Sequence, residues 1–323
     1  MRAVVHDSFG SPDVLEIREI EKPTPADDEL LVRVRAASVN PADWYGVTGR
    51  PWVARPTMGF VKPKETRVGV DFAGTVEAVG KDVTQFRPGD DVFGGRTGAF
   101  AEYVCVREER AVVPKPATVT FEQAAAVPVA ALTALQGLRD KGQLQPGQKV
   151  LINGASGGVG TFAVQIAKAL GAEVTAVCST RNLELVRSIG ADHVIDYTRE
   201  DFTRSDQRYE LMLDIAGSRS WSACRRVLNP RATLVIVGGP KASRLIGPLG
   251  HVVKKSLAGL VSSRKVVFFI AKFNKADMVV LQELLEAGKV ASVIDRRYEL
   301  REIADALRYL GEGHAQGKIV LTV

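Results

Sequence analysis

Hydrophobic positions divide this chain into two parts with different periodicities. Up to about residue 120, short stretches of alternating apolar and polar positions, separated by turns, predict strands at residues 2–6, 15–20, 30–36, 69–80, 92–93 and 99–106. Farther along, helical segments alternate with apolar runs that predict strands at residues 150–152, 174–178, 193–197, 211–215, 233–237 and 266–271. This order predicts an all-β module followed by an α/β domain with a doubly wound parallel sheet.

Helices are predicted where apolar residues recur at helical spacing, at residues 121–135, 159–170, 182–189, 221–228, 277–288 and 303–310. The first helical segment is interrupted at Pro128 and marks the crossover between domains. Residues 240–265 show no clear periodic element. Short strands at 294–295 and 318–323 are expected to return the tail to the β module.

The length of 323 residues favours two domains. We expect the first to combine residues 1–121 with 275–323, and the second to span 122–274. A composition of 46% hydrophobic and 25% charged residues is typical of globular proteins, and no apolar run is long enough for a membrane span. The first residues lack the pattern of a secretory signal, so a cytoplasmic protein is expected.

A glycine-rich turn between a predicted strand and a predicted helix carries the first chemical signal. The turn reads Asn-Gly-Ala-Ser-Gly-Gly-Val-Gly over residues 153–160, and the helix after it continues to Gly171. Glycines let main-chain N–H groups approach a pyrophosphate at the positive end of a helix. The sequence therefore predicts dinucleotide binding by Ala155, Ser156, Gly157, Gly158, Val159 and Gly160.

The end of the second strand of the α/β domain indicates which dinucleotide is expected. An NAD site places an acid there for the ribose hydroxyls. This chain instead has Ser179, Thr180, Arg181 and Asn182, with no carboxylate. Hydroxyls and a guanidinium suit a 2′-phosphate, because charge-assisted hydrogen bonds favour the added charge. NADPH is therefore the expected cofactor.

Cysteine and histidine usage gives no sign of a metal or disulfide framework. The 3 cysteines are far apart and form no C-x-x-C unit, and the 4 histidines stand in no ligand spacing. The net charge of +6 is local, because residues 241–275 contain no acid and carry Lys241, Arg244, Lys254, Lys255, Arg264, Lys265, Lys272 and Lys275. This segment could hold phosphate, a nucleic acid or an anionic membrane surface, or be a solvated face. Nucleic acid is not the expected partner.

Two further segments suggest surfaces. The apolar strand at 266–271 would leave a bare sheet edge, and pairing of two such edges predicts a homodimer. Residues 50–60 contain Trp52, Met58 and Phe60, which could line or cover an apolar substrate pocket or belong to the core.

The order of elements resembles the medium-chain dehydrogenase/reductase superfamily over essentially the whole chain. The motifs resemble its zinc-free quinone oxidoreductase and enone reductase branch, namely Ala155 with Gly158 and Gly160, and residues 38–43, 70–74, 86–90 and 317–321. The resemblance implies a GroES-like catalytic domain and a Rossmann domain. Where zinc-dependent relatives carry a cysteine and Gly-His-Glu, this chain has residues 38–43 and Gly69-Val70-Asp71, so no zinc is expected.

The resemblance also implies roles for individual residues. Asn40, Asp43, Tyr45 and Thr133 should surround the nicotinamide and its ribose, and Tyr197 should flank the adenosine. Gly238, Phe269 and Lys318 are further expected cofactor contacts. Tyr45 is the candidate proton donor, with an aromatic wall as the alternative reading. Asn40 is expected in the catalytic site as an anchor for the carboxamide or ribose.

Without a metal, catalysis must depend on placing the nicotinamide beside an electrophilic carbon and on donors that stabilise negative charge. Conjugated acceptors suit that arrangement. We therefore expect an NADPH-dependent reductase of small apolar α,β-unsaturated carbonyls or quinones. Two alternatives stay open: a quinone reductase that passes single electrons, and a non-catalytic family member that binds nucleotides or nucleic acid.

Overall fold

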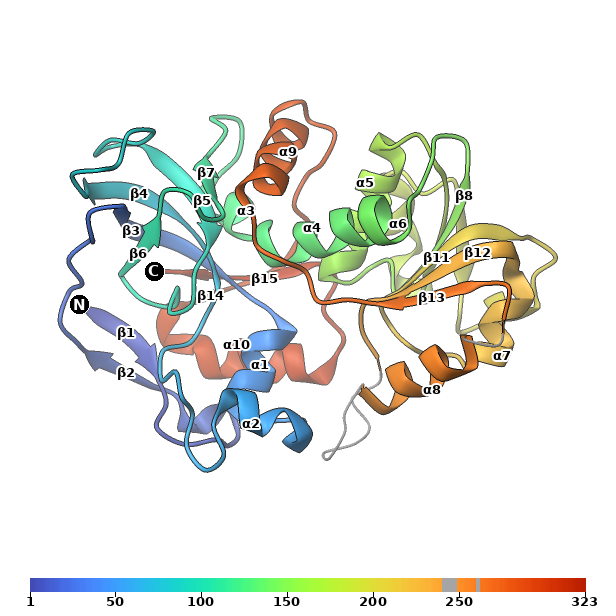
Figure 1. The fold of residues 1–323 in the computed structure, drawn as a ribbon, viewed down its shortest axis with the longest axis horizontal. Coiled ribbons are helices and arrows are strands. Elements are labelled where there is room, and N and C mark those ends of the chain that lie inside the picture. Colours follow the sequence, from blue (N-terminus) through green and yellow to red (C-terminus); the bar gives the residue numbers. More distant parts are fainter. Residues whose placement is uncertain (240–248, 260–261) are drawn as a thin grey trace. The chain divides into compact units, whose positions relative to one another are not determined.

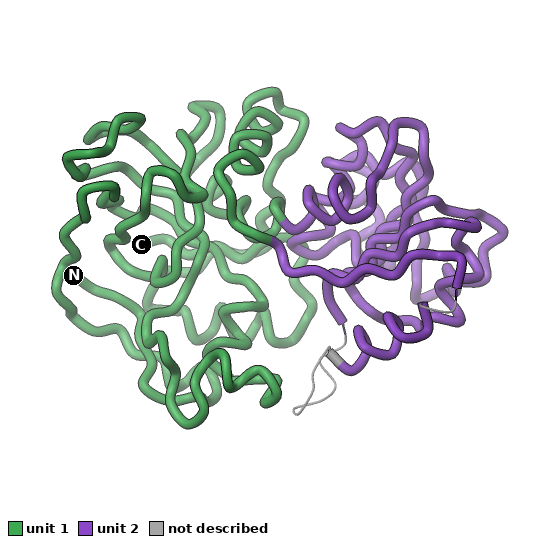
Figure 2. Tube along the Cα trace, in the orientation of Figure 1, with its two compact units in different colours: residues 1–132, 272–323 green, residues 133–271 purple. Residues whose placement is uncertain are grey.

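The computed structural model describes residues 1–239, 249–259 and 262–323 (Figure 1). The chain forms two compact units, one of residues 1–132 and 272–323 and the other of residues 133–271 (Figure 2). These divisions differ from the expected ones at 121/122 and 274/275. Helix α3 (Phe121–Ala125) packs against strands of the first unit, so the crossover helix belongs with the β-rich part.

The second unit contains a six-stranded parallel sheet of order β10-β9-β8-β11-β12-β13. Its strands are β8 (Lys149–Asn153), β9 (Glu173–Cys178), β10 (His193–Asp196), β11 (Tyr209–Asp214), β12 (Leu228–Ile236) and β13 (Lys265–Phe268). Its helices are α5 (Gly158–Ala169), α6 (Leu183–Ser188), α7 (Trp221–Cys224) and α8 (Leu249–Gly259). The predicted doubly wound parallel sheet is confirmed.

Two elements of the second unit differ from the prediction. Helix α8 lies in the region 240–265, for which no element was predicted, and residues 240–248 are outside the described part. Strand β13 ends at Phe268 rather than at 271, and lies at the edge of the sheet. The two residues after Phe268 include Ile270, whose side chain is largely exposed.

The first unit contains a seven-stranded sheet of order β14-β15-β3-β4-β5-β7, with β6 paired to β3. Its strands are β3 (Glu29–Val39), β4 (Asp71–Val79), β5 (Asp91–Gly95), β6 (Tyr103–Arg107), β7 (Val112–Pro114), β14 (Ile294–Glu299) and β15 (Lys318–Thr322). A separate ribbon pairs β1 (Arg2–Val5) with β2 (Glu16–Glu19). Because β15 pairs with β3, the C-terminal tail returns to the β module as predicted.

The helices of the first unit are α1 (Pro41–Thr48), α2 (Arg55–Met58), α3, α9 (Lys275–Glu286) and α10 (Ile303–Glu312). Helix α4 (Pro128–Leu135) runs across the division between the units and continues in a π-helical turn (Gln136–Lys141). Buried apolar side chains form two clusters in the first unit, one that contains Phe72 and one that contains Phe100, and another in the second unit that contains Leu151 and Met212. Each such side chain contributes about 1.5–3 kcal/mol by leaving water.

Within its described residues, the basic segment does not form one surface. Lys255 is buried in an ion pair, Arg264 donates two hydrogen bonds to the Leu228 carbonyl, and Lys275 donates to Gln85 and to the Glu108 carbonyl. Lys241 and Arg244 lie outside the described residues. In the part of the chain that the structure describes, no helix is both long enough and apolar enough to cross a membrane.

Candidate functional site

The glycine turn lies between β8 and α5, as the sequence predicts. Gly154 has φ +94°, which favours glycine, and a Cβ on Gly160 would stand 2.2 Å from the Gly154 carbonyl oxygen. A Cβ on Gly157 would meet only that same oxygen, at 3.7 Å. The turn is therefore closed on the side of Gly160 and open at Gly157, where the first N–H groups of α5 have no intrahelical partner. This arrangement fits a pyrophosphate.

Asn182 connects the glycine turn to the end of β9. Its Nδ2 donates to Ser156 Oγ at 2.9 Å and to Ser179 Oγ at 3.2 Å. The other end of the amide, Oδ1, is buried and has no hydrogen-bond partner among the residues that the structure describes. A buried acceptor without a partner is unusual in a folded protein. A ribose hydroxyl could donate the hydrogen bond that Oδ1 lacks, so this atom fits a bound dinucleotide.

Thr180 has a different partner from the one expected. Its hydroxyl donates to Asp196 Oδ2 at 2.5 Å, and Asp196 also accepts from the backbone N–H and hydroxyl of Thr198. The hydrogen bond from the Thr180 hydroxyl, together with those from Thr198, holds the pKa of Asp196 below its ordinary value, against the opposing effect of burial. The Thr180 proton is thus directed to a carboxylate rather than to a ligand phosphate. Ser179 is half-buried, and Arg181 and Tyr197 are exposed.

The sequence did not predict Asp196 as part of this region, because the expected acid belongs at the end of the second strand. Asp196 closes the third strand, β10, which pairs with β9 and brings Asp196 opposite Cys178. The signal available in the sequence was Asp196 itself, an acid near the end of the strand predicted at residues 193–197. Arg199 Nε lies 3.6 Å from Asp196 Oδ2 and partly offsets its charge.

The remaining predicted contacts of the second unit lie after strands or in a helix. Gly238 follows β12, and a Cβ there would stand 2.4 Å from the Ile215 carbonyl oxygen. Phe269 follows β13, half-buried, with its ring beside Gly137. Thr133 lies in α4 and is half-buried. Gly238 and Phe269 therefore share the carboxyl edge of the sheet with the glycine turn, which is where ligands bind in open α/β sheets.

A buried polar network in the first unit surrounds Asp71, the first residue of β4. Asp71 accepts hydrogen bonds from Ser38 Oγ at 2.8 Å, Asn40 Nδ2 at 2.8 Å and the Val129 backbone N–H at 3.0 Å. Lys318 Nζ lies 3.4 Å from Asp71 Oδ2, and the four side chains are at most 3% exposed. The ammonium and the donors together compensate the buried carboxylate, which would otherwise be very costly.

The same network occupies the polar ends of Asn40 and Lys318. Asn40 Oδ1 accepts from Lys318 Nζ at 2.5 Å, and Asn40 Nδ2 also reaches the Ser38 carbonyl at 3.3 Å. The Lys318 ammonium has a further acceptor in the Val39 carbonyl, at 3.3 Å. All the donor N–H groups of both side chains therefore have acceptors within the protein. In the structure, the donors of both side chains are therefore engaged within the protein.

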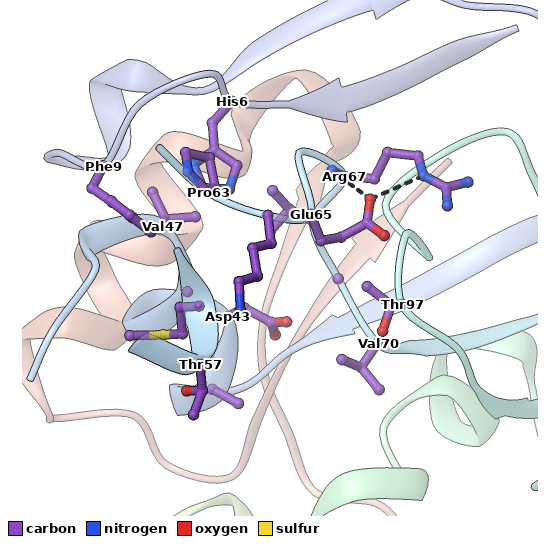
Figure 3. Close-up of a pocket in the computed structure, with 16 residues that line it drawn as sticks. His6, Phe9, Asp43, Val47, Thr57, Pro63, Glu65, Arg67, Val70 and Thr97 are labelled. Carbon is purple, nitrogen blue, oxygen red and sulfur yellow. Dashed lines mark hydrogen bonds and ion pairs between the residues drawn. The ribbon is translucent and has the colours of Figure 1, made fainter. Parts of the chain in front are cut away.

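Asp43 lies in the first turn of α1 and borders a cavity of about 230 Å³ (Figure 3). Its Oδ2 accepts from the Asn40 backbone N–H at 2.7 Å. Burial, opposed in part by that hydrogen bond, raises the pKa of Asp43 to about 7. His6, Thr57 and Thr97 line the same cavity. A carboxyl that titrates near neutral pH thus borders this cavity.

Tyr45 follows on the same helix and is half-buried, with its ring edge-on to Trp44 at 5.3 Å. Burial raises the pKa of the Tyr45 phenol, which therefore stays protonated at neutral pH. Protonation is the condition for a donor role. Tyr45 is not among the residues that line the cavity beside Asp43.

A second buried network, in the second unit, was not predicted. Asp214 ends β11 and is fully buried, and its Oδ2 lies 2.5 Å from Lys255 Nζ on α8. Asn153 Nδ2 donates to Asp214 Oδ1 at 2.7 Å, as does the Gly217 N–H at 3.0 Å. Burial alone would raise the pKa of Asp214, but His251, Lys255 and Asn153 hold it below its ordinary value. The network ties α8 to Asn153, the first residue of the glycine turn.

The described residues hold no group of three or more histidine, cysteine, aspartate or glutamate side chains arranged for a metal ion. At the place where the zinc ligands of relatives were expected, the side chains are Ser38 and Asp71. The Asp71 carboxylate already carries the Lys318 ammonium and three hydrogen-bond donors. A set of one carboxylate and one ammonium, without thiolate or imidazole, does not fit Zn²⁺.

Comparisons with known proteins agree with this architecture. Residues 26–117 match the alcohol dehydrogenase GroES-like domain, and residues 189–321 match a model described as zinc-binding dehydrogenase. A chloroplast quinone oxidoreductase from Triphysaria versicolor is 33% identical over 99% of this chain and 98% of its own length. An NADPH-dependent chloroplast alkenal/one oxidoreductase from Arabidopsis thaliana is 32% identical over 99% of this chain and 79% of its own length.

Solved structures show the same fold. The quinone oxidoreductase of Coxiella burnetii matches with a TM-score of 0.86 and 29% identity, covering 100% of this chain and 99% of that one. The Escherichia coli quinone oxidoreductase, solved in complex with NADPH, matches with a TM-score of 0.83 over 100% of both chains. At 24% identity, the second likeness shows the fold alone.

Proposed function

Because this chain belongs to the quinone oxidoreductase branch of the medium-chain dehydrogenase/reductase superfamily, and is an oxidoreductase of that branch, we propose that it is a metal-independent, NADPH-dependent reductase. Its substrates are small apolar α,β-unsaturated carbonyls or quinones. The observation that carries this proposal is the pairing of an open glycine turn with a buried, unpartnered acceptor at Asn182.

The cofactor, when bound, supplies the hydride. The chain's own contribution begins at Gly157, where the absent side chain leaves the N-terminus of α5 accessible to a pyrophosphate. Asn182 Oδ1 provides an acceptor for a ribose hydroxyl. Ser179 and the exposed Arg181 support NADPH over NADH, because a guanidinium favours the extra phosphate charge. Asp196 weighs against this preference, and Arg199 offsets part of its charge.

Independence from zinc is supported by the donor set around Asp71. Without a Lewis acid, the reaction needs an acceptor that spreads negative charge by conjugation and a group that returns a proton. The protonated phenol of Tyr45 is the proposed donor. Asn40 acts as a positioning residue, because its side chain fixes the start of α1, on which Tyr45 stands.

We further propose that two chains associate as a homodimer through the β13 edge. The edge position of the strand and the exposed Ile270 beyond it support this arrangement. Light scattering at micromolar concentration tests it, and a monomeric mass would exclude it. The cytoplasm is the proposed location, supported by three unpaired cysteines, which suit a reducing compartment.

The proposed function is tested by steady-state kinetics with NADPH and NADH against a graded panel of enals, enones and quinones. Arg181→Ala should raise KM for NADPH far more than KM for NADH, because the guanidinium favours only the 2′-phosphate. Arg187→Ala, which removes a surface partner of Glu184, is the matched control. An equal effect of Arg181→Ala on both cofactors would refute the cofactor preference.

The basic segment does not favour the non-catalytic alternative, because Lys255, Arg264 and Lys275 have partners within the protein. That alternative would require no oxidation of NADPH with any member of the panel, together with salt-sensitive binding of RNA.

A further inference from the structure

A short lobe of the first unit, residues 50–64, exposes an unusual set of apolar side chains. It contains a 3₁₀ turn (Trp52–Ala54), helix α2 and the turn that follows. Trp52 is 54% exposed, Val53 55%, Phe60 74% and Val61 81%. Sequence alone left open whether Trp52 and Phe60 belong to the core, and the structure excludes that reading. Clustered exposed apolar side chains mark an interaction surface.

Hydrogen bonds and a cation–π contact stabilise the conformation of the lobe in which these apolar side chains are exposed. Arg55 Nε donates to the Gly49 carbonyl at 3.1 Å, and its Nη1 donates to the Phe60 carbonyl at 3.2 Å. The same guanidinium lies 4.6 Å from the centre of the Phe9 ring. Gly59 has φ +119°, and a Cβ there would stand 2.0 Å from the Lys62 carbonyl oxygen. This tight turn carries Phe60 and Val61 outward.

The charges on the lobe have one sign. Residues 44–64 contain Arg50, Arg55, Lys62 and Lys64 and no aspartate or glutamate. Arg55 and Lys64 bond to backbone carbonyls, Lys64 to that of Pro56 at 3.1 Å. Over the described ranges, no carboxylate forms an ion pair with any of the four cations. The neighbouring acids have other partners, Asp7 bonding to Arg18 and Glu65 to Arg67.

We propose that this lobe docks the protein on the surface of an anionic lipid bilayer. Aromatic and aliphatic tips would enter the interface between headgroups and acyl chains, as Trp and Phe do in peripheral proteins. The surrounding cations would attract lipid phosphates. The combination of exposed apolar side chains and cations favours a lipid surface over a nucleic acid, because a nucleic acid would leave the apolar side chains in water. The inference goes beyond the reductase activity and does not depend on it.

Helix α8 provides the matched comparison. Val253 and Leu257 are 53% and 61% exposed, and Lys254 beside them is also exposed. Its next cation, Lys255, is instead buried against Asp214. Substitutions on α8 therefore remove two exposed apolar side chains without touching the lobe.

The test is co-sedimentation of the full-length protein with vesicles, either of phosphatidylcholine alone or of equal parts phosphatidylcholine and phosphatidylglycerol. We expect binding to the anionic vesicles only, weakened by salt. Trp52→Ser with Phe60→Ser should abolish it, and Lys62→Glu should reduce it about fivefold or more. Val253→Ser with Leu257→Ser should leave it unchanged.

Several results would overturn the proposal. These are failure to bind anionic vesicles, equal binding by the Trp52/Phe60 double variant, or loss of binding only in the α8 variant. A change in mass by light scattering in the double variant, without vesicle binding by the parent, would assign the lobe to contact between copies. A raised KM of the double variant for a water-soluble quinone, again without vesicle binding by the parent, would assign the lobe to substrate binding. Vesicle binding is measured without cofactor or substrate, so its outcome is separate from that of the proposed reaction.

Discussion

The ammonium of Lys318 lies 2.5 Å from Asn40 Oδ1, so the last strand of the chain holds the residue that begins α1. Lys318 also lies 3.4 Å from Asp71, which binds Asn40 from its other end. One buried cation thus links β15, β4 and the start of the helix that carries Asp43 and Tyr45.

Removing the cation should leave Asp71 as an uncompensated buried charge. Lys318→Met is expected to lower the free energy of unfolding by about 3–5 kcal/mol, measured by chemical denaturation. Lys22→Met is the control, because Lys22 pairs with Glu77 on the surface, and it should cost at most about 1 kcal/mol. A loss below about 1 kcal/mol for Lys318→Met would contradict the role given to the network.

Asp43 should make stability depend on pH. Burial raises its pKa from 3.8 to about 7, so folding favours the protonated form. The stabilisation is complete below about pH 4 and is lost as the pH rises through about 7. Between pH 5 and pH 8 the wild-type free energy of unfolding should fall by roughly 1–4 kcal/mol more than that of Asp43→Asn. Parallel profiles would show that Asp43 does not titrate in this range.

Two glycines of the turn should respond differently to alanine. Gly157→Ala has room and an ordinary backbone, with φ −83°, so stability should change by no more than about 0.5 kcal/mol. Its new methyl group should nevertheless raise the Kd for NADPH about tenfold or more. Gly160→Ala places Cβ 2.2 Å from the Gly154 carbonyl oxygen and should cost about 1–3 kcal/mol of stability. If calorimetry shows that Gly157→Ala binds NADPH with unchanged affinity, the pyrophosphate does not bind at Gly157.

Tyr45→Phe tests the proton donor. The kcat for an enone should fall about 10²-fold or more if the phenol gives the proton. Tyr103→Phe, on β6, is the control and should leave kcat unchanged. A loss of less than about threefold in Tyr45→Phe would leave the residue as an aromatic wall, with solvent as the proton source.

Much of the fold could be predicted because periodicity and turns are local. The β8, glycine turn and α5 unit is an example, since apolar spacing, glycines and the stop at Gly171 all lie within one window. Strand β14 was predicted only at 294–295, because Arg296 and Arg297 interrupt the apolar pattern on an edge strand. Helix α8 was missed because it presents Val253 and Leu257 to solvent and buries Lys255, which inverts the usual pattern.

The polar partners at the candidate site were harder to predict. Thr180 lies in the turn after β9 and Asp196 at the end of the neighbouring strand β10, and Asn40 meets a lysine from the other end of the chain. Sequence spacing identifies which residue types are present, but it does not show which side chain accepts a hydrogen bond from which donor. Resemblance named Asn40 and Lys318 as contacts, and only the structure shows that their donors already have acceptors.

The proposed reaction transfers a hydride from NADPH to a conjugated carbon. It is tested most directly by reducing an enone with NADPH deuterated at the transferred position of C4, and by locating the label in the product with NMR. The account predicts a saturated ketone with deuterium on the β-carbon. Consumption of NADPH without label in the product, or semiquinone radicals from a quinone with no saturated product from the enone, would contradict it.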